Sequence, residues 1–150
     1  MRTVNGLEEL KALVGQEIGI SEWMKIDQQR INDFADATLD HQWIHINEEK
    51  AKMSPIGSTI AHGFLTLSLL PNFMEEIWKI DGIKMGINYG LNKVRFTAMV
   101  PVNSRIRMKA TLNSLEDVSG GVQMTVTAIF EIEGNDKPAC IAESLTRLYF

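Results

Sequence analysis

The spacing of hydrophobic positions changes along the chain, from helical in the first half to strict alternation in the last third. Three short stretches have the spacing and caps typical of helices: 6–14 with Asn5 as N-cap and Gly15 at the end, 28–37 with Asp27 as N-cap, and 48–53 with Asn47 as N-cap. Residues 17–26, between the first two predicted helices, have a mixed hydrophobic pattern that resembles a strand.

Residues 61–78 form the most apolar segment. Large side chains cover nearly all sides of a helix here: Phe64, Leu65, Leu67, Leu69 and Leu70. A helix that is apolar on all sides is typically buried, and Pro71 must kink it or end its first half. Ser58 and Thr59 precede the segment and are expected to satisfy its N-terminus.

After residue 82 the hydrophobic period becomes two. Residues 104–110 alternate basic and apolar side chains, 122–132 place an apolar side chain at every second position, and 138–149 form a last predicted strand. Turn residues separate the strands at 119–121 and 134–136. One buried helix followed by long antiparallel strands predicts an α+β fold in which the sheet wraps around a central helix. Open sheet edges favour pairing with a second copy, so a homodimer is expected.

Composition narrows the possible classes. The length of 150 residues fits one domain, 1–150, and 45% hydrophobic residues can fill a core. A net charge of -4 argues against a nucleic-acid binder and a polybasic membrane anchor. The single Cys140 is expected to be a buried, inert thiol. The charged N-terminus fits neither a signal peptide nor a membrane span, so the expected compartment is the cytoplasm.

Residues 38–47, TLDHQWIHIN, fit neither period and hold the candidate chemistry. Asp40 and His45 pair a carboxylate with an imidazole, which can share the work of general base and general acid on one water. On spacing alone, a capping Asp and a surface His are the more common explanation. Together with Asp40, the histidines at 41, 45 and 62 offer ligand types that suit zinc, but no regular helix joins the first two, and a metal is not expected.

The segments TLDHQWIHINEEKA and SPIGSTIAHGFLTLSLLP resemble the MaoC-like dehydratase family. The branch that fits best includes nodulation protein N-like proteins and short (R)-specific enoyl-CoA hydratases. The resemblance continues through GINYGLNKVRFTAMVPVNSRIR and KPACIAESLTRLYF. It implies a hot-dog fold, an antiparallel sheet wrapped around a long central helix, working as a dimer without metal or cofactor.

The resemblance also implies a reaction and roles. The reaction is hydration of trans-2-enoyl thioesters of CoA or acyl carrier protein to (R)-3-hydroxyacyl thioesters, or the reverse dehydration. Asp40 and His45 match the family's catalytic pair, and Gly63 matches the glycine whose backbone N–H holds the thioester oxygen. Such a donor suits the enolate-like charge that develops on that oxygen.

Four further residues are candidate substrate contacts, each with a structural alternative. Trp43 can shape the acyl pocket or fill space beneath the loop, and His62 can line the site or serve only as a helix-start or interface residue. Asn88 can bond near the site or within the dimer. Arg95, with Lys93, Arg105 and Arg107, can hold phosphates or cover a solvated sheet face.

Leu39 departs from the family, which usually has glycine before the catalytic Asp. If the backbone there has a positive φ, leucine is strained. Two alternative functions remain open at this point: a hot-dog thioesterase, and a non-catalytic acyl-thioester binding or signalling protein.

Overall fold

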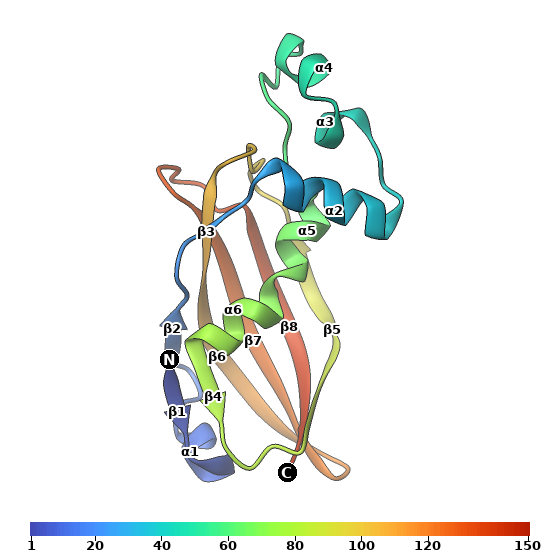
Figure 1. Cartoon of the computed structure of the whole chain (residues 1–150). Helices are drawn as coiled ribbons and strands as arrows, with labels where there is room; N and C mark the ends of the chain where they lie inside the picture. The colour runs from blue at the N-terminus through green and yellow to red at the C-terminus, as the bar shows by residue number, and fades with distance from the viewer.

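The computed structural model describes residues 1–150 as one curved antiparallel sheet with helices against it and beyond one end (Figure 1). The strands are β1 (Arg2–Val4), β2 (Glu17–Ile20), β3 (Met24–Lys25), β4 (Trp78–Ile80), β5 (Met85–Arg95), β6 (Arg105–Val118), β7 (Gly121–Ile132) and β8 (Cys140–Tyr149). The helices are α1 (Gly6–Ala12), α2 (Gln28–Thr38), α3 (Trp43–Ile46), α4 (Glu48–Met53), α5 (Gly63–Ser68) and α6 (Leu70–Ile77).

The main sheet has the order β2-β6-β7-β8-β5, with β3 also paired to β6. The alternation predicted for 104–110 is present, and it runs further than predicted because β6 continues to Val118. Ile106, Met108 and Ala110 are fully buried on one face of β6. Met108 lies opposite Phe130 of β7 in the register, so the apolar faces of the long strands join in one core.

The predicted central helix is two helices, α5 and α6, which cross the face of the sheet (Figure 1). They meet at Leu69, and Pro71 lies in the first turn of α6. Proline lacks the N–H that would continue the α5 hydrogen bonds, so a break here has a direct cause. Phe73 of α6 is fully buried against the sheet. The expectation of burial on all sides was wrong for Phe64, whose side chain is 68% exposed.

The predicted helix over 61–78 also ends one residue early, because Trp78 begins β4. That strand pairs in parallel with β1 in a separate two-stranded sheet, which the sequence did not reveal. No helix in the structure combines the length and hydropathy needed to cross a membrane.

Two of the three predicted helix caps are confirmed. The Asp27 carboxylate accepts the Arg30 N–H at 2.9 Å, and the Asn47 side chain accepts the Lys50 N–H at 2.9 Å. The cap predicted for Asn5 was wrong: its side chain makes no cap bond and instead donates to the Glu9 carboxylate at 2.8 Å. A helix this short is held by its packing rather than by its cap.

Helices α2, α3 and α4 lie beyond one end of the sheet, next to the start of α5 (Figure 1). The chain leaves α2, forms α3 and α4, and returns to α5. This arrangement brings the polar 38–47 segment against the N-terminal end of the central helix.

Candidate active site

Asp40 lies in the turn between α2 and α3, and His45 lies on α3. Helix α2 ends at Leu39, which adopts a left-handed conformation with φ 62° and ψ 20°. Glycine is the residue that usually ends a helix this way, since a Cβ is unfavourable there. The strain anticipated for Leu39 is therefore present, at a side chain that is 81% exposed.

The His45 ring is buried and fixed in one tautomer. Its Nδ1 lies 2.7 Å from the carbonyl oxygen of Ile60, and a carbonyl only accepts, so Nδ1 carries the proton. Nε2 is then an unprotonated nitrogen, with no hydrogen bond to the protein. Burial lowers the pKa of His45 and nearby His62 lowers it further, whereas the Ile60 carbonyl and Asp40 act in the opposite direction. The net effect favours a neutral imidazole, the form that can accept a proton.

Gln28 of α2 holds the backbone of His45, a role that the sequence did not reveal. Its amide donates to the His45 carbonyl at 2.7 Å and to Asn32 Oδ1 at 2.9 Å. Its amide oxygen accepts the hydroxyl of Thr59, which is 1% exposed. The expectation that Thr59 satisfies the central helix was therefore wrong. Glutamine is common on helix surfaces, so no local signal distinguishes Gln28.

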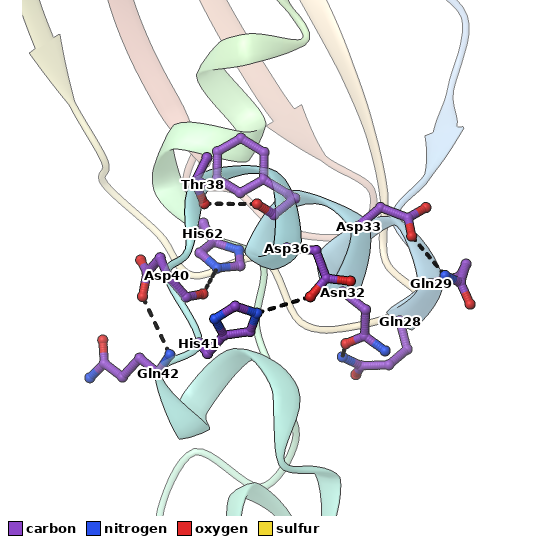
Figure 2. A network of polar contacts seen from close by, with 11 residues as sticks. Gln28, Gln29, Asn32, Asp33, Asp36, Thr38, Asp40, His41, Gln42 and His62 are labelled. Carbon is purple, nitrogen blue, oxygen red and sulfur yellow. Dashed lines mark hydrogen bonds and ion pairs between the residues drawn. The ribbon is translucent and has the colours of Figure 1, made fainter.

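His62 joins Asp40 to His45. Its Nε2 lies 3.0 Å from the Asp40 carbonyl oxygen, as Figure 2 shows. Its ring stacks on that of His45, with centroids 3.7 Å apart and planes at 20°. The Asp40 side chain is exposed, and its Oδ1 accepts the Gln42 N–H at 3.3 Å. Asp40, His45 and His62 thus form one compact cluster.

A pocket of about 350 Å³ opens beside this cluster. Its lining includes His45, Gly63 and Thr66, with Phe96 and Met99 from the segment after β5. Gly63 begins α5, and its backbone N–H makes no hydrogen bond within the protein. A Cβ at this position would lie 3.0 Å from the Phe96 ring, so a larger residue requires that ring to shift by a few tenths of an ångström. His45, with its unprotonated Nε2, and Gly63, with its unpartnered backbone N–H, therefore line the same pocket.

The other candidate contacts lie outside this pocket. Trp43 has the ammonium of Lys50 4.7 Å above its ring. Asn88 lines two hollows between α5–α6 and β5, and Arg95 lines a fourth hollow with Lys93. Thr97 contributes to both the Arg95 hollow and the His45 pocket, so these two adjoin.

The same three residues are close enough to be considered as metal ligands. Possible ligand atoms of Asp40, His45 and His62 lie within 4.8 Å of one another. Imidazole lone pairs lie in the ring plane, and two nearly parallel planes 3.7 Å apart do not direct them at one ion. His41 lies apart and pairs with Asp36 at 2.9 Å. The arrangement suits proton transfer better than a shared zinc ion.

Cys140 is buried as expected. Burial raises the pKa of its thiol to about 11, so it stays protonated at neutral pH.

A family model and individual relatives agree on what this chain is similar to. Residues 9–133 match the model of the MaoC like domain family. The chain is 51% identical over 148 residues to 3-hydroxyacyl-thioester dehydratase Z of Mycobacterium tuberculosis, covering 98% of each chain. It is 44% identical to Nodulation protein N of Rhizobium leguminosarum bv. viciae, covering 96% of this chain and 91% of the relative.

The fold comparison agrees. The (R)-hydratase from A. caviae involved in PHA biosynthesis superposes with a TM-score of 0.74 at 20% identity, covering 90% of this chain and 96% of that one. The predicted hot-dog fold is confirmed. The chain belongs to the MaoC-like domain family.

Proposed function

We propose that this chain catalyses the reversible hydration of trans-2-enoyl thioesters to (R)-3-hydroxyacyl thioesters, with water activated by Asp40 and His45. Membership of the hydratase–dehydratase class follows from the family and the 51% identical dehydratase. The observation that carries the assignment of residues is the tautomer of His45. Its protonated Nδ1 is held by Ile60, which leaves Nε2 as a base beside the pocket.

In the proposed mechanism a water lies between the Asp40 carboxylate and His45 Nε2. As the water oxygen bonds to Cβ of the enoyl thioester, one of its protons passes to the pair. The electrons of the double bond move toward the thioester oxygen, and Cα then takes a proton from the pair. The reverse sequence removes water, since both directions share one transition state. General acid–base catalysis of this kind contributes roughly 10²–10⁴-fold.

Gly63 is the proposed donor to the thioester oxygen. Its N–H has no partner within the protein, and it shares the pocket with His45. A donor placed where negative charge develops is worth about 3–4 kcal/mol in other enzymes. This pairing of base and donor in one pocket supports hydration rather than mere binding.

The proposed substrate path follows the adjoining hollows. From the His45 pocket it passes Thr97 to Arg95 and Lys93, where a guanidinium and an ammonium suit the phosphates of CoA or of a carrier-protein arm. For the acyl tail we propose the separate hollow along α5–α6 that Asn88 lines, which shares no lining residue with the His45 pocket. Trp43, on α3 with His45, is the remaining proposed substrate contact, whereas His62 does not line the pocket.

The proposed working form is a homodimer. Strand β5 pairs only with β8, and its other edge is open. Its apolar side chains are 44–55% exposed: Met85, Ile87, Tyr89 and Leu91. An open apolar edge favours pairing with a second copy. The proposed dimer is built from one hot-dog domain per chain, 1–150, since the 28-residue core takes members from Val4 to Leu148.

The test measures loss of the enoyl-thioester ultraviolet band with trans-2-enoyl-CoAs of increasing chain length, together with release of free thiol. Wild type should remove the band without releasing thiol. Asp40→Asn and His45→Gln should lose activity by about 10²-fold or more. His41→Gln is the matched control, because this exposed histidine pairs only with Asp36.

Release of thiol would instead indicate a thioesterase. Binding of enoyl-CoA by folded protein with no turnover at any chain length, on CoA or on carrier protein, would indicate a non-catalytic binder. Either result contradicts the proposed reaction.

A further inference from the structure

We propose that His62 is a positioning residue for the catalytic pair: one ring nitrogen fixes the Asp40 peptide while the ring face fixes the plane of His45. This inference rests on the function proposed above. His62 is absent from the residues that line the 350 Å³ pocket, so it acts through its two neighbours.

The hydrogen bonds define the tautomer of His62. The Asp40 carbonyl oxygen, 3.0 Å from Nε2, can only accept, so Nε2 carries the proton. Nδ1 is then unprotonated, and it is buried with no hydrogen-bond partner in a residue that is 3% exposed. The geometry therefore fixes His62 as an Nε2–H donor to the Asp40 carbonyl.

The contacts of the ring connect three elements. His62 lies at the N-cap position of α5. Phe34 of α2 packs on it with a centroid distance of 4.9 Å and a tilt of 57°, and His45 of α3 stacks on it at 3.7 Å. A residue serving only as a helix start would not need an aromatic ring in contact with both of these helices.

The position of Asp40 depends on its hydrogen bond from His62. The residue is exposed, and it follows the strained Leu39. Its side chain has one bond within the protein, the long 3.3 Å contact with the Gln42 N–H. The donor from His62 is the part-buried contact that ties the Asp40 peptide to the His45 ring. Without it, the Gln42 contact alone holds Asp40, so the carboxylate can move relative to the imidazole, which Ile60 and Gln28 keep in place.

Two substitutions separate the two contacts. His62→Phe keeps an aromatic ring against Phe34 and His45 but removes the donor. His62→Gln keeps an N–H that can reach the Asp40 carbonyl but removes the ring. We expect kcat in the Phe variant to fall about 10–100-fold, as displacement of a reacting group by 1 Å typically does. KM should change little, and Gln should restore part of the loss.

A spectroscopic readout tests the inference apart from turnover. The chain has three histidines, so ¹⁵N-histidine NMR resolves each one. In wild type at neutral pH, we expect His62 as the Nε2–H tautomer and His45 as the Nδ1–H tautomer. In His62→Gln, which removes the stacked ring, the His45 ring signals should broaden or shift while those of His41 stay unchanged.

A His62 protonated on Nδ1 at neutral pH, or wild-type kcat in a folded His62→Phe, would overturn the inference. If that variant does not fold, the wild-type tautomer and the Gln variant still decide it. A wild type with no turnover but the expected tautomers and signal shifts would contradict the proposed reaction while supporting the contact network.

Discussion

The side-chain amide of Gln28 donates a 2.7 Å hydrogen bond to the backbone carbonyl of His45, seventeen residues further along the chain. The same side chain accepts from buried Thr59, beside Ile60, whose carbonyl accepts from the His45 ring. One glutamine on α2 thus connects the two segments that hold the proposed base.

The first prediction concerns this connection. Gln28→Ala leaves the buried Thr59 hydroxyl without its acceptor, which should cost about 1–3 kcal/mol in free energy of unfolding. Because the backbone of His45 is released, kcat should also fall. Gln29→Ala is the matched control, since Gln29 bonds only to exposed Asp33, and it should stay within about 0.5 kcal/mol of wild type. Urea unfolding measures the free energy of unfolding, and the enoyl-CoA assay measures kcat. Equal stabilities of Gln28→Ala and Gln29→Ala would show that the Gln28 hydrogen bonds do not stabilise the fold.

A second prediction follows from the left-handed Leu39. Leu39→Gly removes the Cβ that is unfavourable at φ 62° and loses little burial, because the side chain is 81% exposed. The relief of about 1–2 kcal/mol is partly offset by the greater freedom of glycine in the unfolded chain, so a net gain of a few tenths to about 1 kcal/mol is expected. Leu39→Ala keeps the Cβ and should bring no such gain. Thermal unfolding compares wild type, Leu39→Gly and Leu39→Ala. A loss of stability in Leu39→Gly would refute the strain argument.

The third prediction is a pH dependence of stability. Burial lowers the pKa of His45 in the folded chain below its ordinary value of 6.5. The unfolded chain therefore binds more protons between the two pKa values, so His45's contribution to stability is complete above about pH 6.5 and is lost as pH falls toward the folded pKa. The difference in Tm between wild type and His45→Gln, measured against pH, should shrink below pH 6.5. A difference independent of pH from 8 to 5 would show that the pKa is not lowered.

Gly63 provides a fourth prediction. Gly63→Ala places a Cβ 3.0 Å from the Phe96 ring, at the proposed oxyanion donor. Phe96 is 46% exposed and can move, so we expect a small loss of stability but a fall in kcat of roughly 10²-fold. Phe96→Ala removes the clash, so the double variant should recover activity relative to Gly63→Ala alone. Strictly additive effects in this cycle would show that the two residues do not interact.

The fifth prediction concerns the open edge of β5. Ile87→Lys with Leu91→Lys places two charges among exposed apolar side chains, and charges discourage pairing at a sheet edge. Sedimentation should show a dimer for wild type and a monomer for this variant. Lys109→Glu on β6, which is paired on both edges, is the control and should leave the dimer intact. A wild-type monomer would contradict the proposed assembly.

Most of the correct predictions rest on patterns that lie within a few residues of one another along the chain. Caps at Asp27 and Asn47, the proline that interrupts the central helix, and the alternation around Ile106 and Met108 each act within a few residues along the chain. The α+β arrangement follows from them, because an apolar helix and half-apolar strands have few other ways to bury their surfaces. The motif around Asp40 and His45 indicated the family for the same reason: its residues are close in sequence.

Only the tertiary structure decided the contacts between distant segments. Sequence spacing gave no reason to pair β1 with β4, to stack His62 on His45, or to place Gln28 against the His45 carbonyl. The two histidine-site contacts depend on where the chain returns from α4 to the central helix, and the pairing of β1 with β4 depends on where the end of α6 lies; packing of the whole core sets both positions. The amino-acid sequence by itself determined most of the helices and strands and the acid–base kind of chemistry. The fold determined the tautomer of His45, the donor to the Asp40 carbonyl and the ring stacked on His45, because hydrogen bonds between distant residues form only after the chain is packed.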